Sequence, residues 1–389
     1  MSLAELDLLR LTEALDLART SFGLTEPNPR VGCVIGTEAG DVLGRGATQA
    51  AGHAHAEVMA LRDAQSVGSS VRGATAWVTL EPCAHQGLTP PCCDALVAAG
   101  IGRCVVALQD PFPAVAGAGL ARMRAAGVVV EHVDDPAIVG AARDINIGFF
   151  TRMERGRPWV RVKVAASLDG RTALENGRSQ WITGEASRAD GHSWRRRASA
   201  VMTGIGTVLA DDPRLDVRAV TTVNQPLRIV LDSRLRTPSS AALLRVPGKT
   251  LVIAAPGNST AAEGLRAAGA EVWDDWRHNA MPLLSELLVR LANRGINEVH
   301  VEAGATLTGA LLMAGLADEL LVYLAPTILG PGRPFATLPT LAKLPATAGY
   351  HWVAYDAVGG DLRVRLRRDD PDQGRGALIR ASEGFTLPP

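Results

Sequence analysis

The chain has 389 residues, of which 47% are hydrophobic and 21% are charged, and its 40 basic and 40 acidic side chains give a formal net charge of zero. This length suits two domains, and the composition is typical of chains that bury full hydrophobic cores. Nucleic-acid-binding proteins usually carry a basic excess that neutralises phosphates, so the charge balance disfavours that class of partner.

The N-terminus and the cysteines bear on the compartment. The first residues, Met-Ser-Leu-Ala-Glu-Leu-Asp, lack the apolar core of a signal peptide, and no segment approaches 18 uninterrupted apolar residues. The five cysteines are odd in number and clustered, which argues against a disulfide framework. We therefore expect a cytoplasmic protein without a membrane partner.

The first part of the chain predicts a layered arrangement of helices and strands. Residues 3–22 carry apolar side chains at three- and four-residue spacings, which is typical of an amphipathic helix. A helix from Pro91 to Ala99 would join two strands, at 74–80 and 104–108, into a parallel unit. Further strands are expected at 31–35 and 42–45, and a helix is expected whose first turn includes His55. The stretches 120–130 and 136–150 predict a helix, a strand and a second helix in that order.

Residues with metal and proton chemistry gather between positions 55 and 92: His55, Glu57, Cys83 and Cys92. One imidazole and two thiolates suit zinc, and three protein ligands leave a position for water, as in catalytic sites. Glu57 would then be free to carry protons between that water and a substrate. The order His-x-Glu followed by Pro-Cys is typical of zinc-dependent deaminases, although their motif ends Pro-Cys-x-x-Cys and Cys92 here is nine residues after Cys83.

Other interpretations of these residues stay open. Taken singly, each cysteine could be a small buried hydrophobe. A closed structural zinc would need a fourth ligand, for which His53, His85 and Cys93 are candidates, but such a site has no use for Glu57. The alternative functions are a nucleic-acid-editing deaminase whose second domain is not catalytic, and a zinc-stabilised binding protein without turnover.

A change of composition indicates a second domain. Residues 151–158 are polar and basic, and we interpret them as the boundary between domains 1–150 and 151–368. The tail 369–389 is rich in Gly, Pro and Arg, and we expect it to be loosely ordered. In the second domain, strands are expected at 159–165, 200–203, 227–231, 250–254, 298–302, 320–324 and 361–366, and helices at 185–199, 260–268, 281–294 and 306–314, an alternation that favours an α/β fold.

Two glycine-containing junctions between a strand and a helix, at 203–207 and 302–309, could hold a phosphate group on backbone N–H groups. Neither matches Gly-x-Gly-x-x-Gly, so a plain turn explains each of them as well. The run from Arg195 to Arg197 would ordinarily be a solvated helix face, and Arg218 is a possible phosphate clamp.

Over nearly its whole length the chain resembles the bifunctional deaminase/reductase family of riboflavin biosynthesis. The motifs that carry this resemblance are Pro27-Asn28-Pro29, His55-Ala56-Glu57-Val58, Glu81-Pro82-Cys83-Ala84-His85, Thr89-Pro90-Pro91-Cys92, Ser167-Leu168-Asp169-Gly170-Arg171, Ser179-Gln180-Trp181-Ile182, the stretch 207–213 and Glu302-Ala303-Gly304. The resemblance implies an N-terminal cytidine-deaminase-like αβα domain followed by a dihydrofolate-reductase-like α/β domain, and a homo-oligomer.

The resemblance also implies two reactions on a small phosphorylated pyrimidine. The first domain would use Zn²⁺ to deaminate 2,5-diamino-6-(ribosylamino)pyrimidin-4-one 5′-phosphate. The second would use NADPH to reduce the ribosyl group, giving 5-amino-6-(ribitylamino)uracil 5′-phosphate.

Positions that match the family's motifs receive its roles by resemblance. Zinc would be bound by His55, Cys83 and Cys92, with Glu57 as the catalytic proton carrier. The substrate of the reductase would contact Ser179, Arg195, Leu215, Arg218 and Glu302. NADPH would contact Ala165, Trp181, Thr207, Asp211, Ser233, Gly304, Ala305, Thr306, Leu307, Thr308, Gly309 and Ala310. Around the deaminase pocket, Leu88, Phe112 and Ala118 replace polar or basic residues of the family, which removes groups that could hold the substrate phosphate.

Overall fold

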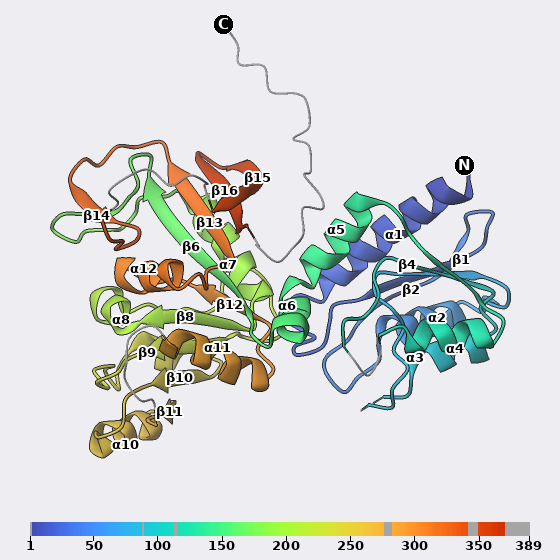
Figure 1. The fold of residues 1–389 in the computed structure, drawn as a ribbon, viewed down its shortest axis with the longest axis horizontal. Helices are drawn as coiled ribbons and strands as arrows, with labels where there is room; N and C mark the ends of the chain where they lie inside the picture. Colours follow the sequence, from blue (N-terminus) through green and yellow to red (C-terminus); the bar gives the residue numbers. More distant parts are fainter. Residues whose placement is uncertain (1, 88, 113–115, 276–281, 341–348, 370–389) are drawn as a thin grey trace, which may run out of the picture.

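The protein is seen in a computed structural model, which describes residues 2–87, 89–112, 116–275, 282–340 and 349–369. Two β-sheets, one from each half of the chain, form separate lobes, and α6 (Ile147–Arg155) lies between them (Figure 1). Leu88 and the tail after Asp369, for which the sequence made predictions, lie outside the described residues.

The first lobe is a three-layer αβα domain, as the resemblance implied. Its five-stranded sheet has the order β2-β1-β3-β4-β5, in which β1 is antiparallel to β2 and β3, while β3, β4 and β5 are parallel. The strands are β1 (Gly32–Gly36), β2 (Val42–Ala47), β3 (Thr75–Val78), β4 (Arg103–Val106) and β5 (Val129–His132). One face is covered by α1 (Leu3–Thr20) and α5 (Pro136–Ile145), and the other by α2 (Ala56–Ser66), α3 (Cys92–Ala98) and α4 (Ala118–Ala125).

The expected helix at 136–150 is in fact two helices, α5 and α6, and this prediction was wrong. The chain turns at Asn146, whose side-chain amide binds the backbone of Arg30 in both directions: its Oδ1 accepts from the Arg30 N–H at 2.7 Å, and its Nδ2 donates to the Arg30 carbonyl at 2.9 Å. This distant partner could not be read from local periodicity.

The second lobe is built on a nine-stranded sheet with the order β11-β10-β9-β8-β12-β6-β13-β16-β15. The seven strands from β11 to β13 are parallel, and the antiparallel hairpin β15–β16 completes one edge. The strands are β6 (Trp159–Ser167), β8 (Ala200–Gly204), β9 (Leu227–Leu231), β10 (Thr250–Ile253), β11 (Glu271–Trp273), β12 (Glu298–Val301), β13 (Glu319–Ala325), β15 (Tyr350–Val358) and β16 (Asp361–Arg368). The helices are α7 (Glu185–Arg197), α8 (Ile205–Asp211), α9 (Ala242–Arg245), α10 (Ser259–Ala267), α11 (Pro282–Asn293) and α12 (Ala305–Met313), and β7 (Arg171–Leu174) pairs with β14 (Gly332–Pro334) as a separate ribbon.

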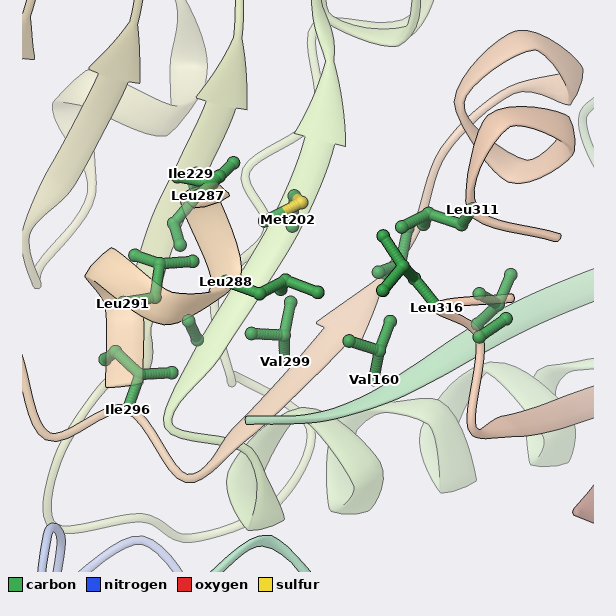
Figure 2. Packing of buried hydrophobic residues seen from close by; sticks show 14 of the residues in the cluster. Val160, Met202, Ile229, Leu287, Leu288, Leu291, Ile296, Val299, Leu311 and Leu316 are labelled. Carbon is green, nitrogen blue, oxygen red and sulfur yellow. The ribbon is translucent and has the colours of Figure 1, made fainter. Parts of the chain in front are cut away.

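Helices on both faces bury the parallel strands. On one face, Leu287, Leu288 and Leu291 of α11 pack against Ile229, Met202 and Val299 of the central strands (Figure 2). Fully burying each such side chain contributes about 1.5–3 kcal/mol. Strands that are covered on both faces have continuous runs of apolar residues, so their positions could be predicted from the sequence.

The elements that the sequence analysis missed are short or exposed. Buried and exposed side chains do not alternate regularly along β15, and Trp352 and Tyr355 are largely exposed at the sheet edge. The stretch 203–207, which the sequence predicted to be a junction between a strand and a helix, is the end of β8 running directly into α8, with no loop between them. Within the described residues, no helix combines the length and the apolar character that crossing a bilayer requires.

Candidate metal centre and reductase site

The start of α2 holds the histidine and the spare carboxylate. His55 is the N-cap residue, just before the first turn rather than inside it, and Glu57 lies in the first turn with only 3% of its surface exposed. The helix approaches β2 closely because that strand has glycine at two positions. A Cβ at Gly46 would lie 2.0 Å from the Ala56 carbonyl oxygen, and one at Gly44 would lie 2.2 Å from that of Ala60.

The two cysteines come from the loop after β3 and from the start of α3. Pro91 is the N-cap residue of α3, so Cys92 occupies the first helical position, and the helix begins one residue later than the predicted start at Pro91. The Cys92 backbone N–H donates to Cys83 Sγ at 3.3 Å, and the Cys93 N–H donates to the Cys83 carbonyl at 3.2 Å. The bond to Sγ, with the positive end of the helix dipole, favours a thiolate at Cys83, and the bond to the carbonyl holds the loop against the start of α3.

His55, Cys83 and Cys92 converge on one point. Nδ1 of His55 lies 3.2 Å from Cys92 Sγ and 3.6 Å from Cys83 Sγ, and all three ligand atoms lie within 4.8 Å of one another. Tetrahedral zinc with ordinary Zn–N and Zn–S bonds separates its ligand atoms by roughly 3.4–3.8 Å. The donor set therefore fits zinc, with three protein ligands and one position left for a reacting molecule.

The candidates for a fourth protein ligand do not join this cluster. Among the described residues, the metal-binding group contains His55, Cys83 and Cys92 alone. Cys93 Sγ points to Asp94 at 3.7 Å, and the His85 ring packs edge-on against Phe112 with centroids 5.9 Å apart. The geometry thus matches an open catalytic site better than a closed structural one.

Glu57 lies beside the ligands without belonging to them. Burial, together with the nearby charge of Cys83, raises the pKa of Glu57 to about 7. A carboxyl group with a pKa near neutrality can both accept and release a proton. This is the behaviour that the sequence analysis assigned to Glu57.

Glu81 is a structural carboxylate for which the sequence predicted no role beyond its place in the motif Glu81-Pro82-Cys83. It is buried two residues before Cys83 and accepts four backbone N–H groups. Its Oε2 binds the N–H of Gly117 at 2.9 Å and of Asp110 at 3.3 Å, and its Oε1 binds those of Gly119 at 3.0 Å and Leu120 at 3.4 Å. One carboxylate therefore caps α4 and ties Asp110 and Gly117 to the loop that carries Cys83.

In the second lobe, Arg195 and Glu302 form a two-pronged ion pair, with Arg195 Nη2 2.8 Å from Glu302 Oε2. Glu302 directly follows β12, and Arg195 lies in the last turn of α7. Arg195 Nη1 also donates to the Asp216 carbonyl at 2.9 Å, which connects the clamp to the 214–218 loop. The arginine run is thus not a solvated face, since Arg195 and Arg197 are both held in pairs.

The loop that follows α8 carries Leu215 and Arg218. Leu215 is buried in a left-handed backbone conformation, with φ at 53°. The side chain of Arg218 is 48% exposed and pairs with Asp216 Oδ1 at 2.7 Å. Arg218 therefore has the freedom to turn to an incoming anion, whereas Leu215 is fixed.

Many of the predicted cofactor contacts lie at the carboxyl ends of parallel strands. Ala165 lies near the end of β6, Ser233 follows β9, and Gly304 is the N-cap residue of α12 just after β12. Thr207 of α8 accepts from the Gly304 N–H at 3.2 Å, so the two glycine junctions are in contact. Ligands bind to this edge in open α/β sheets. The remaining α12 positions, Ala305 to Ala310, form the first turns of that helix.

The predicted contacts differ in their exposure and in their neighbours. Trp181 is 68% exposed and stacks under Arg188, whose guanidinium carbon lies 4.7 Å from the ring centroid. Ser179 is partly buried, while Asp211 and Ser233 are exposed. Among the described residues, no hydrogen bond joins Ser179, Asp211 or Ser233 to the Arg195–Glu302 pair.

Lys163 is a charged residue of this region that the sequence analysis missed. Burial lowers the pKa of its ammonium group, which also feels the charges of Glu302 and Arg195. A lysine inside the apolar run of β6 is an unusual choice for a buried strand, and that exception was the available signal.

Comparison with known proteins identifies both halves. Residues 5–108 match the family model of the cytidine and deoxycytidylate deaminase zinc-binding region, and residues 158–353 match the RibD C-terminal domain. The riboflavin biosynthesis protein RibD of Escherichia coli K12 is 43% identical over 92% of this chain and 98% of its own length, and that of Haemophilus influenzae is 39% identical over 92% and 96%. The chain belongs to the RibD family.

Solved structures agree with this assignment. RibD of Acinetobacter baumannii superposes with a TM-score of 0.84 at 39% identity, covering 94% of this chain and all of that one. A deaminase/reductase from Thermotoga maritima superposes with a TM-score of 0.83 at 29% identity, covering 94% and 99%.

Membership in the RibD family settles the broad function. The chain is a bifunctional enzyme of riboflavin biosynthesis, with a zinc-dependent deaminase domain and an NADPH-dependent reductase domain that act on small phosphorylated pyrimidines. The predicted family, fold class and cofactors are confirmed. A nucleic-acid-editing deaminase is not favoured.

Proposed function

We propose that the first lobe hydrolyses the 2-amino group of 2,5-diamino-6-(ribosylamino)pyrimidin-4-one 5′-phosphate, and that the second reduces the product to 5-amino-6-(ribitylamino)uracil 5′-phosphate. The Thermotoga maritima relative carries the name of this pair of activities. The observation that carries the proposal is the cluster of His55, Cys83 and Cys92, with the buried Glu57 beside it.

In the deaminase lobe, His55, Cys83 and Cys92 would hold the zinc. Bound zinc supplies acidification of a water molecule near neutral pH. Glu57 accepts a proton from the attacking water and delivers it to the substrate, so that the oxygen of water bonds to the ring carbon and the amine leaves as ammonia. Glu57 itself is buried, which limits the access of bulk water to the proton that it carries.

In the reductase lobe, we assign substrate binding to Ser179, Arg195, Leu215, Arg218 and Glu302. Arg195 is fixed by Glu302 and by the Asp216 carbonyl, so it presents a charge at a constant position. Arg218 is half exposed and can exchange its Asp216 partner for the substrate phosphate.

For NADPH, which supplies the hydride, we assign the carboxyl edge of the large sheet, with Ala165, Thr207, Ser233 and the start of α12 as its centre. The first N–H groups of α12 have no side-chain cap, which leaves them available to a pyrophosphate. Trp181 and Asp211 complete the assigned cofactor contacts, and the exposed ring of Trp181 is suited to stacking.

We place the boundary between the domains within residues 151–158. Support comes from the two separate sheets, with β6 of the second beginning at Trp159 shortly after α6 ends at Arg155. The predicted ranges are 1–150 and 151–368, with the tail 369–389 beyond them, and because α6 continues to Arg155 we place the division within that boundary at 156–158.

We further propose a cytoplasmic homo-oligomer. All five cysteines are free thiols, which suits a reducing compartment. The edge strand β15 exposes Trp352 and Tyr355, apolar surface that a second subunit would cover. Sedimentation of the purified protein checks this proposal, and a monomer at micromolar concentration would contradict it.

A coupled assay tests the proposed reactions. Given the diamino substrate, the enzyme should release ammonia first and then consume NADPH in equal amount. Removing zinc with a chelator should abolish ammonia release while leaving NADPH consumption on pre-deaminated substrate intact, since the sites lie in different lobes. Salt-dependent RNA binding, or bound zinc without ammonia release, would contradict the proposal.

A further inference from the structure

Arg30 belongs to the deaminase lobe but reaches the reductase lobe. It directly precedes Val31 and β1, and its side chain is almost fully buried. Its Nη1 donates to the Ile145 carbonyl and to Glu298 Oε1, both at 2.8 Å. Its Nη2 donates to Glu26 Oε1 and to the Arg197 carbonyl, both at 2.6 Å. Two of these four acceptors, Glu298 and Arg197, lie in the second lobe.

The two carbonyl groups are at the ends of helices. Ile145 is the last residue of α5, and Arg197 is the last residue of α7. The final carbonyl groups of a helix have no partner inside it and carry the negative end of its dipole, so a guanidinium group stabilises them. One arginine of the first lobe thus caps one helix from each lobe.

The helix end capped in the second lobe is part of the reductase site. Arg195 lies two residues before the capped carbonyl of Arg197, in the last turn of α7. Its guanidinium group is clamped between Glu302 and the Asp216 carbonyl. Any rotation or fraying of that last turn therefore moves the guanidinium group relative to both partners.

Glu298 connects Arg30 to the other half of the clamp. Its fully buried carboxylate binds Arg30, Arg161 and Arg197 at 2.8, 2.9 and 3.0 Å. Burial opposes its ionisation, but these three guanidinium groups lower the pKa of Glu298 to about 2. Glu298 begins β12, and Glu302 directly follows that strand at an even spacing, which places both side chains on the same face.

We propose that Arg30 is a positioning residue of the reductase site: the deaminase lobe fixes the Arg195–Glu302 clamp by capping α7 and by pairing with Glu298. The inference rests on the proposed role of Arg195 and Glu302 in binding substrate. It gives the fusion of the two lobes a function in the second reaction, since within the described part of the chain the side chain that caps the Arg197 carbonyl comes from the deaminase lobe.

Arg30→Met tests the proposal, because it keeps the apolar stem and removes all four donated bonds. With pre-deaminated substrate and saturating NADPH, its reductase KM should rise about tenfold, as small displacements of positioning groups weaken binding steeply. Arg30→Lys should show only a two- to threefold rise, because an ammonium group can still reach part of the same acceptors. Arg45→Met is the matched control, since Arg45 lies in the same lobe but is half exposed and pairs only with Glu13 among acidic side chains of the described residues; its KM should not change.

A purely structural role would lower the amount of active enzyme, and thus kcat, at an unchanged KM. An unchanged reductase KM in Arg30→Met would therefore overturn the inference. If that variant does not fold, Arg30→Lys decides alone: a two- to threefold higher KM supports the inference, and a wild-type KM refutes it.

Arg195→Lys, measured in parallel, separates this inference from the proposed function. A higher KM in Arg195→Lys with no change in the Arg30 variants would refute only the positioning role. No change in Arg195→Lys would instead refute the assignment of Arg195 to the substrate site, and the positioning role with it.

Discussion

Replacing Glu81 by glutamine should weaken the deaminase lobe far more than its conservative chemistry suggests. The carboxylate accepts two N–H groups on each oxygen, and all four donors belong to the 110–120 segment. Glutamine retains one acceptor oxygen and turns an NH₂ group towards two of these donors. The variant therefore loses one well-formed bond, of 2.9 or 3.0 Å, and one long bond, of 3.3 or 3.4 Å.

The magnitude follows from those two lost bonds. A hydrogen bond to a charged group contributes about 1.5–3 kcal/mol, and the long bond contributes less. The loss of the negative charge at the start of α4 adds about 0.5 kcal/mol. We expect the free energy of unfolding of this lobe to fall by about 3 kcal/mol, which corresponds to a urea midpoint lower by about 1–2 M.

Domain-specific readouts make this measurable in the intact protein. Zinc release to a chromogenic chelator in urea reports on the deaminase lobe, and NADPH oxidation on pre-deaminated substrate reports on the reductase lobe. With pre-deaminated substrate and NADPH both saturating, so that a raised reductase KM does not affect the rate, only the first midpoint should shift. Glu131→Gln is the control, because Glu131 lies in the same lobe but is half exposed and pairs with Arg103. A zinc-release midpoint within about 0.3 M of wild type would refute the reasoning, since it would mean that the two lost bonds contribute less than about 1 kcal/mol.

Three further predictions test the sites and the interface. Glu57→Gln should retain zinc, lose about 10²- to 10⁴-fold in ammonia release, and keep its reductase activity, because in the proposed reaction Glu57 moves protons and lies outside the ligand group. Metal analysis and both assays check this, and loss of zinc would contradict it. Arg218→Ala should raise the reductase KM at a nearly constant kcat, and an unchanged KM would remove Arg218 from the phosphate site. The lowered pKa of Glu298, about 2 against an ordinary 4.5, means that its stabilising contribution is complete above pH 4.5 and is lost as the pH falls towards 2. Acid unfolding followed by circular dichroism should therefore be less steep in Glu298→Gln, and an identical pH profile would contradict the ion-pair assignment.

Both halves of the fold were visible in the sequence where local physics dominates. The parallel strands of the second lobe, such as β9 and β10, are buried on both faces and appear as short apolar runs. The start of α3 was marked by Pro91, and its end by Gly100, whose φ of 78° suits glycine. By contrast, the division between α5 and α6 depends on the bonds of Asn146 to Arg30, 116 residues away.

The zinc site could be identified from the sequence because its chemistry is carried by residue type. A metal centre is the simplest explanation for a histidine and two cysteines at the starts of helices and the end of a strand. A carboxylate two residues from the histidine then has a role in moving protons to and from the zinc-bound water. The structure added the distances, 3.2 and 3.6 Å from His55 Nδ1 to the two sulfur atoms, and the exclusion of Cys93 and His85.

By itself, then, the sequence determined the order of the two domains and predicted the metal ligands and the proton carrier that we propose, since these depend on residue chemistry and short-range periodicity. Only the tertiary structure decided what the arginines do. Arg195 finds Glu302 across 107 residues, and Arg30 finds Glu298 across 268. A guanidinium group can pair with any carboxylate that the fold brings near it, so spacing along the chain carries no record of the choice.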